Sequence, residues 1–162
     1  MRHKARAIRG KQGTQAGMTF LELIIAMSIL LILSTAALPI ARYTVKRQKE
    51  TELRRDLREM RDAIDRYKDT ADKGLIRTEV GSENYPPDLD ALVKPIQLGA
   101  GNDRKIRFLR KIPVDPMTGQ TEWGLRAVQD DPDSTSWGGK NVFDVYCKSM
   151  GTALDGTRYA DW

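Results

Sequence analysis

The sequence predicts an α+β protein in which one long N-terminal helix packs on a small antiparallel β-sheet. Three observations support this fold class. Residues 18–40 form an apolar run with a single charged residue, Glu22. From Leu53 to Ala71 an apolar residue then recurs every three or four positions, which is the spacing of one helix face. Two segments near the end of the chain alternate as β-strands do. A chain of 162 residues has room for one domain of ordinary size plus an anchor.

Residues 1–17 form a basic leader ahead of the apolar run. They contain no acidic residue, and their arginines and lysines account for the whole net charge of +5. The rest of the chain is balanced, so the high pI does not indicate a nucleic-acid partner. Because positive flanks stay in the cytoplasm, we expect the N-terminus inside and everything after the apolar run outside. The cations are Arg2, Lys4, Arg6, Arg9 and Lys11.

The apolar run is expected to be the transmembrane half of the helix. At about 1.5 Å per residue, residues 18–40 span about 35 Å, which is enough to cross the hydrocarbon core of a bilayer. Pro39 is expected to kink the helix, because proline lacks a backbone donor and crowds the preceding turn. The prediction is therefore a single-pass protein with residues 41–162 on the far side of the membrane.

Beyond Pro39 the helical pattern becomes amphipathic over residues 41–73. The charged residues between the apolar positions are interpreted as a solvated face that can also contact other subunits. Lys73 and Gly74 supply a helix stop, so one helix is predicted from about residue 19 to about residue 72. The apolar stripe consists of Leu53, Leu57, Met60, Ile64, Tyr67 and Ala71.

The remainder of the chain is predicted to hold the small sheet. Residues 74–120 form an irregular αβ connection, in which a short apolar patch at 89–93 favours a helical turn or two. Residues 121–162 form the sheet and a C-terminal loop. The strands are predicted at 121–128 and 142–148, where side chains alternate.

The chain contains one cysteine, Cys147, and one histidine, His3. A single cysteine cannot form an intramolecular disulfide, and without Cys–His clusters a structural zinc site is not expected. A Ser/His/Asp or Cys/His catalytic set has no histidine to use after the leader. We therefore expect no enzyme, and interpret Cys147 as a small buried apolar group in a strand.

Glu22 is a lone carboxylate near the start of the apolar run. Such a residue costs about 2.5–3.5 kcal/mol near the centre of a membrane helix, and less toward its end, so it requires a partner. If the chain is cut after Gly17, the new amino group of Met18 lies within about two helical turns of Glu22. In a polymer the amine of one subunit can pair with Glu22 of the next, which would fix the axial stagger between subunits.

Residues 17–22, Gly-Met-Thr-Phe-Leu-Glu, resemble the processing and methylation signature of type IV prepilins and type II secretion pseudopilins. The resemblance implies a type IV pilin-like fold, a prepilin peptidase that cuts after Gly17, and N-methylation of Met18. Phenylalanine is the commonest first mature residue in this family, and here it is methionine. Pro39 falls where these proteins usually carry a helix-breaking proline.

The soluble part resembles the major, G-type pseudopilin of type II secretion. Residues 108–119 are similar to the segment in which an Ile/Leu-Pro-x-Asp-Pro run enters the first strand, and residues 143–162 to the last strand and tail. A major type IV pilin normally carries two cysteines, so the single cysteine favours a pseudopilin.

The resemblance implies a structural role in a homopolymer that also contains minor pseudopilins. An inner-membrane assembly platform with its cytoplasmic ATPase would build this polymer into a periplasmic filament that drives protein export. The alternative is a type IV pilin of a surface fibre, which would serve adhesion, motility or DNA uptake.

The same resemblance implies calcium as a candidate cofactor. Major pseudopilins often hold this ion in the C-terminal loop, and Asp155, Asp161 and carbonyls near Ser149 are the candidate ligands. Calcium requires six to eight oxygens. The tail departs from the family pattern at residues 152–154, where an acidic, glycine-rich stretch is common. A ligand or the whole calcium site can therefore be lost here. A second acidic cluster, residues 130–133, is interpreted as a turn with capping carboxylates.

Two simpler interpretations of the N-terminus compete with a prepilin. The first is an ordinary signal peptide, cut near Ala36. Against it, Glu22 interrupts the start of the apolar run and the helical pattern continues through the supposed cut. The second is a plain single-span anchor for a periplasmic binding or enzyme domain, in which nothing requires Glu22 beside a Gly17 cleavage point.

Overall fold

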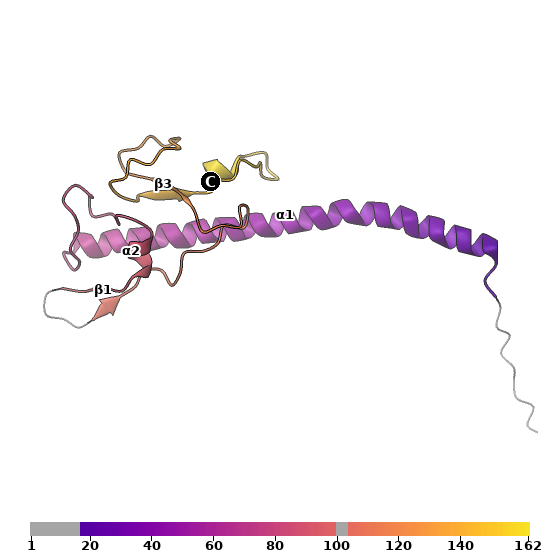
Figure 1. The fold of residues 1–162 in the computed structure, drawn as a ribbon, viewed down its shortest axis with the longest axis horizontal. Coiled ribbons are helices and arrows are strands. Elements are labelled where there is room, and N and C mark those ends of the chain that lie inside the picture. The colour runs from indigo at the N-terminus through magenta and orange to yellow at the C-terminus, as the bar shows by residue number, and fades with distance from the viewer. Residues whose placement is uncertain (1–16, 100–103) are drawn as a thin grey trace, which may run out of the picture. The chain divides into compact units, whose positions relative to one another are not determined.

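The computed structural model describes residues 17–99 and 104–162, and for residues 36–38 it describes the backbone only (Figure 1). Its contacts cluster into two compact units, Met1–Arg42 and Tyr43–Trp162. The predicted leader lies outside the described residues, except for Gly17.

A single helix, α1, runs from Phe20 to Asp72 and confirms the predicted long N-terminal helix. Thr19 begins it: its carbonyl accepts the first helical hydrogen bond from the amide of Leu23, at 3.1 Å. The Thr19 hydroxyl oxygen also accepts a hydrogen bond from the amide of Glu22, at 3.2 Å. Threonine is a favoured N-cap residue because this side-chain oxygen satisfies an amide that has no partner within the helix.

The C-terminal end of α1 is closed by Gly74, at the predicted stop. Gly74 has a φ of 68°, a left-handed conformation that glycine adopts without steric cost. Its amide donates to the carbonyl of Ala71 at 2.8 Å, and the amide of Leu75 donates to the carbonyl of Thr70 at 3.2 Å. This pair of bonds is the Schellman motif, which satisfies carbonyls that the last turn would otherwise leave unpaired.

The first unit contains the apolar half of α1. From Met18 to Leu33 its large apolar side chains are all exposed, by 43% to 78%. By length and composition α1 is able to cross a membrane, and it is the one helix in the described part of the chain that passes this test. The backbone stays helical through Pro39, and the kink at that residue remains a prediction.

In the second unit, α1 supplies one side of the hydrophobic core. All six residues of the predicted apolar stripe are buried, with exposed fractions of 6% or less. They pack in one cluster with side chains from the rest of the domain, so the amphipathic pattern correctly predicts the buried helix face. These partners include Leu92, Phe108, Trp123, Val142 and Val145.

The connection after α1 is more structured than predicted. It contains a short helix, α2 (Asp90–Val93), at the expected apolar patch. It also contains two strands that the sequence did not indicate, β1 (Ile96–Gln97) and β2 (Lys105–Ile106), which pair in antiparallel fashion. The amides of Phe108 and Leu109 both donate to the carbonyl of Leu92, which ties this segment to α2.

The second sheet confirms the predicted strand pair, with shorter strands. Strand β3 (Gly124–Arg126) pairs in antiparallel fashion with β4 (Asp144–Tyr146), and Leu125 lies opposite Val145. Gly124 faces the ring of Tyr146 so closely that a Cβ would clash with it, which explains the glycine at this position. Together with α1, the two small antiparallel sheets make the protein α+β, as predicted.

A buried turn at Asp115 precedes β3. Its Oδ1 accepts hydrogen bonds from the amides of Met117 and Thr118, and Asp115 is fully buried. Cys147 is also fully buried, as predicted, although it lies just after β4 and not within the strand. Burial, followed by the influence of the Asp115 carboxylate, raises the pKa of the Cys147 thiol to about 12, so it stays protonated at neutral pH.

Candidate functional site

The first candidate site is the N-terminal end of α1. Gly17 and Met18 lie in exposed, non-helical backbone just before the helix, and Met18 is 68% exposed. A Cβ placed on Gly17 would meet nothing within 4 Å. The peptide bond between these two residues is therefore in a segment that a peptidase can approach.

Glu22 lies in the first turn of α1. An acid in this turn interacts favourably with the positive end of the helix dipole. Thr19 and Glu22 have the T-x-x-E spacing of a capping box, and the threonine half of that motif forms here. The capping role of Thr19 was not predicted, although the T-x-x-E spacing is visible in the sequence. The Glu22 side chain itself has no hydrogen bond or ion pair within the described residues.

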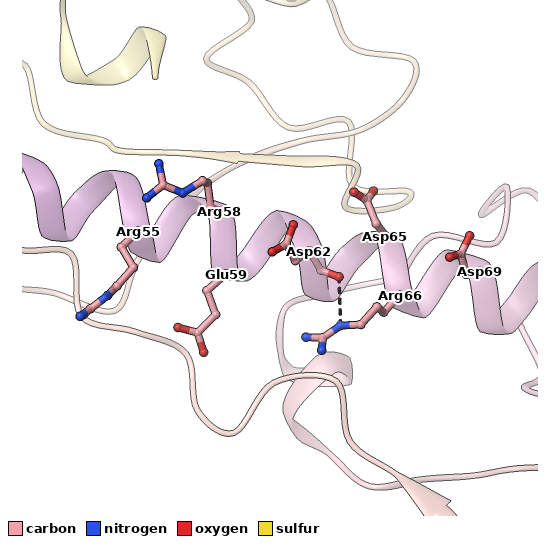
Figure 2. A pocket seen from close by; sticks show the side chains of 7 residues that line it. All are labelled: Arg55, Arg58, Glu59, Asp62, Asp65, Arg66 and Asp69. Atoms are coloured by element: carbon pink, nitrogen blue, oxygen red, sulfur yellow. Dashed lines mark hydrogen bonds between the residues drawn. The ribbon is translucent and has the colours of Figure 1, made fainter.

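The second candidate site is the outer surface of α1 in the second unit, shown in Figure 2. We call it the charged face. Arginines lie in its earlier turns and acidic residues dominate its later turns, so one helix carries a positive and a negative patch. A shallow depression on this face is lined by Arg55, Arg58, Glu59, Asp62, Asp65, Arg66 and Asp69.

Most of the charged face lacks partners among the residues that the structure describes. Arg66 is engaged, because it donates to the carbonyls of Asp62 at 3.2 Å and Phe108 at 2.9 Å. Arg55 pairs with the neighbouring acids Glu52 and Asp56. Within the described residues no hydrogen bond or ion pair forms from the remaining charged groups, which are the Arg58 guanidinium and the carboxylates of Glu59, Asp62, Asp65 and Asp69.

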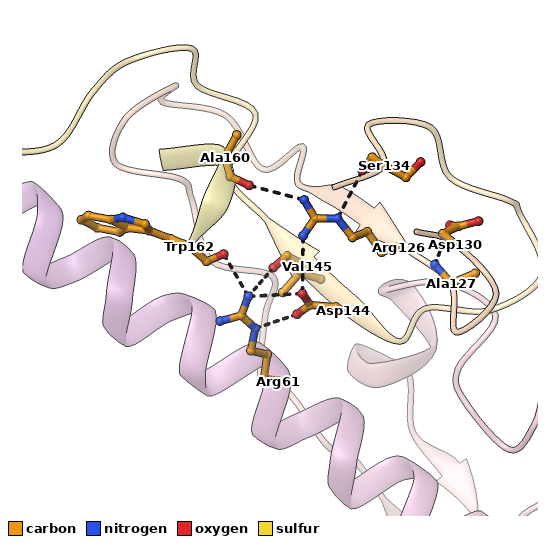
Figure 3. Close-up of polar contacts among 9 residues, drawn as sticks. All are labelled: Arg61, Arg126, Ala127, Asp130, Ser134, Asp144, Val145, Ala160 and Trp162. Carbon is orange, nitrogen blue, oxygen red and sulfur yellow. Dashed lines mark hydrogen bonds and ion pairs between the residues drawn. The ribbon is translucent and has the colours of Figure 1, made fainter. Parts of the chain in front are cut away.

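A third cluster joins α1 to the end of the chain through Arg61 (Figure 3). Its Nε donates to Asp144 on β4 at 2.6 Å. Its Nη2 donates to the carbonyls of Val145 at 3.1 Å and Trp162 at 2.9 Å. One planar guanidinium thus satisfies acceptors on two separate segments, which its fork of donors allows.

The residues nominated for calcium are engaged in other contacts. Asp155 accepts from Arg54 at 2.9 Å through Oδ2, and from the amide and hydroxyl of Thr157 through Oδ1. Asp161 pairs with Arg158 through both oxygens. The hydroxyl of Ser149 accepts from the amide of Gly151.

These contacts do not fit a calcium site. Among the described residues, no group of three or more His, Cys, Asp or Glu side chains is arranged to hold a metal ion. Both nominated carboxylates already pair with an arginine, with which a calcium ion would compete.

The acidic cluster at residues 130–133 behaves as a capped turn. Oδ2 of Asp130 accepts hydrogen bonds from the amides of Ala127 at 2.7 Å and Gly138 at 3.1 Å. These bonds favour the charged form and hold the pKa of Asp130 below its ordinary value.

Comparison with known proteins identifies the N-terminal site. Residues 13–38 match the prokaryotic N-terminal methylation motif. The chain therefore carries a type IV prepilin-like leader and N-terminus, which is typical of structural, pilin-like subunits that are processed and assembled into filaments. No curated protein and no solved structure matches the chain.

We predict that acid weakens the second unit. Hydrogen bonds from Thr157, then the Arg54 guanidinium, lower the pKa of Asp155, and the pKa of Asp130 is lowered as described. A carboxyl group with a lower pKa in the folded state stabilises it above the unfolded pKa of about 3.9, and this contribution is lost as the pH falls through the folded value. The free energy of unfolding, measured with urea, should therefore fall as the pH decreases below about 4.

The matched control is Asp155→Asn, which removes the titrating group but keeps its size. Its stability should change less steeply with pH over the same interval. Identical pH profiles for the variant and the natural protein would contradict the assignment. Burial raises the pKa of Asp56, so the titration of Asp56 changes the stability with pH in the opposite direction. Because Asp155→Asn removes only the contribution of Asp155, this variant separates the two effects.

Proposed function

We propose that this chain is a structural subunit of a periplasmic pseudopilus, which grows from the inner membrane and drives protein export by type II secretion. The observation that carries the proposal is the order of features at the N-terminus. A processing-type Gly17–Met18 junction precedes an apolar helix with one acid, Glu22, in its first turn, and all lie within the matched methylation motif. The role is structural, and a cytoplasmic ATPase supplies the energy for assembly.

Processing would begin on the cytoplasmic side of the membrane. The basic leader holds the N-terminus in the cytoplasm, and the domain beyond the apolar part of α1 is exported to the periplasm. A prepilin peptidase then cuts after Gly17 and methylates the amino group of Met18. The exposed backbone at this junction supports such a cut, since a peptidase requires a non-helical strand of substrate.

Cleavage would create the partner that Glu22 lacks. The new amine lies four residues before Glu22, which corresponds to about 6 Å of axial rise in a helix. In a filament the amine of one subunit would neutralise Glu22 of its neighbour, because a carboxylate in an apolar surrounding requires a compensating positive charge. This pairing would set the axial register between subunits.

The charged face would supply the periplasmic contact between subunits. A filament is built from head-to-tail interfaces, in which two different patches of each subunit meet. The unpartnered Arg58 and the unpartnered acids at Asp62, Asp65 and Asp69 are two such patches of opposite charge on one helix. Their complementarity would guide the register of neighbouring copies.

Features of the second unit favour a pseudopilus over a surface fibre. The Asp115 turn and strand β4 lie in the segments that resemble major pseudopilins, and the single cysteine excludes the disulfide-closed loop of a typical pilin. A type IV pilin is the alternative within the class, and the appearance of a fibre outside the cell in electron micrographs would favour it.

Intact mass spectrometry tests the processing step. The mature protein should begin at Met18 and carry one added methyl group. Gly17→Val should retain the leader, since the peptidase requires a small residue before the cut, whereas Gly13→Val should be processed normally. Cleavage near Ala36 would instead identify an ordinary signal peptide and exclude the proposed function.

Glu22→Gln tests the register. This change keeps the size of the side chain but removes its charge, so the amine of the neighbouring subunit loses its ionic partner. The variant should insert into the membrane and be processed, yet the yield of filaments should fall by about tenfold or more, as expected for the loss of about 1.4 kcal/mol or more per contact.

The control is Glu122→Gln, an exposed acid of the second unit that should assemble at the natural level. Filaments are quantified by shearing and immunoblotting. Normal assembly of Glu22→Gln would contradict the proposed role of this carboxylate. If the protein were a monomeric, membrane-anchored domain, the substitution would likewise have no effect.

Charge reversal tests the charged face. Asp65→Arg places a second positive charge among the unpartnered groups, so it should reduce filament yield several-fold without changing the thermal unfolding of the subunit. Adding Arg58→Asp to it restores opposite charges and should recover part of the yield. Lys140→Glu, an exposed reversal in the 129–141 loop, is the matched control. Equal yields for all variants would show that the charged face is only a solvated surface.

A further inference from the structure

The last segment of the chain, residues 149–162, docks on a polar row along α1. Lys46, Glu50 and Arg54 follow one another at four-residue intervals, and Arg61 follows two turns later, so all four lie on one side of the helix. Each contacts the segment 149–162. This row was not predicted, because its partners lie about a hundred residues away in the sequence.

Lys46 and Glu50, the first half of the row, carry opposite charges and bind acceptors and donors of the segment, respectively. Lys46 Nζ donates to the carbonyl of Thr152 at 2.7 Å. Glu50, which is 9% exposed, accepts from the amide of Leu154 and from the hydroxyl of Tyr159, both at 2.9 Å. Burial and then the Glu50 hydrogen bond raise the pKa of Tyr159 to about 12, so its hydroxyl remains a donor at neutral pH.

Arg54 holds the turn that contains Asp155. Its guanidinium donates to Asp155 Oδ2 at 2.9 Å and lies over the Trp162 ring, 4.0 Å from the ring centroid. The Asp155 carboxylate is fixed in turn by Thr157. The arginine thus combines an ion pair with a cation–π contact, a pairing to which the flat guanidinium is suited.

Arg126 completes the set from the sheet side (Figure 3). It donates to the carbonyls of Ser134 at 3.2 Å and Ala160 at 3.4 Å, and lies 3.6 Å from Asp144. Its guanidinium also stacks on the ring of Tyr146, 4.2 Å from the centroid. Asp144 therefore lies between Arg61 and Arg126, and each of these arginines reaches a carbonyl of the segment 149–162.

A divalent cation in a loop of this kind gathers carboxylates and backbone carbonyls around one positive charge. Here acceptors of the same kinds, Asp155, Asp144 and the carbonyls of Ala160 and Trp162, are met by guanidinium donors. Charge-assisted hydrogen bonds to arginine stabilise such acceptors without a metal.

We propose that Arg54, Arg61 and Arg126 replace a divalent cation in holding the C-terminal segment, so that this protein folds independently of calcium. The three residues are called the arginine clamp. The inference concerns the second unit alone, and it stands whether or not the chain assembles into a filament.

The direct test needs no variant. The full chain is purified in detergent, and its thermal unfolding is followed by circular dichroism with excess calcium chloride and with excess EGTA. The Tm should be the same under both conditions, because the positive charge is covalently part of the chain. A Tm that rises with calcium or falls with EGTA would overturn the proposal.

A pair of variants tests the clamp itself. Arg61→Met keeps most of the side-chain length but removes the bonds to Asp144, Val145 and Trp162. Hydrogen exchange of the amides in the segment 149–162 should become about tenfold faster, as expected when charge-assisted bonds that hold a segment are lost. Arg55→Met is the matched control, because Arg55 is an exposed arginine on the same helix whose ion pairs are local, and it should leave this exchange unchanged.

Calcium should not slow the exchange of Arg61→Met. Unchanged exchange in that variant, or its recovery on addition of calcium, would overturn the clamp. Should Arg61→Met fail to fold, Arg54→Met removes a half-exposed member of the set and gives the same readout, with faster exchange around Asp155 expected and unchanged exchange contradicting the proposal.

Discussion

The structure depends on one helix that must satisfy two solvents. From residue 20 to residue 33, α1 exposes apolar side chains all around, which water would not tolerate and a lipid or filament interior would stabilise. From residue 43 to residue 72 the same helix has one buried apolar stripe and one charged face, as a helix on the surface of a soluble domain requires. The change of pattern near Pro39 therefore marks a change of surroundings, and the division of the chain into two units at residue 42 follows it.

The parts of the fold that the sequence predicted are those with local, periodic causes. The helix follows from the spacing of Leu53 to Ala71, and its end from the conformational freedom of Gly74. The pair β3 and β4 follows from alternation, although each strand is only three residues long. The methylation motif was equally local, because its recognition uses contiguous residues around Gly17. In each case the physical signal lies within a few turns or one strand.

What the sequence could not predict depends on partners distant in the chain. Strands β1 and β2 are two residues each, too short for alternation to be visible. The polar row on α1 resembled a solvated face, since nothing local distinguishes Arg54 or Arg61 from Arg58. Only the folded chain shows that Arg54 contacts Asp155 and that Arg61 contacts the carbonyl of Trp162. The contact that engages the calcium candidate Asp155 was hidden for the same reason, because its partner Arg54 lies far away in the sequence.

Two glutamates of α1 show how the protein handles a carboxylate removed from water. Glu50 is buried in the second unit, and the amide of Leu154 and the hydroxyl of Tyr159 both donate to it, so its desolvation is compensated within one chain. Glu22 sits among apolar side chains, and no donor of the described chain reaches its carboxylate beyond the favourable field of the helix terminus. In the proposed filament, the free amine at residue 18 of a neighbouring copy would remove that cost. The same physical requirement is thus met by tertiary structure at Glu50, and under the proposed function it would be met by quaternary structure at Glu22, which would join the processing step and polymerisation in one mechanism.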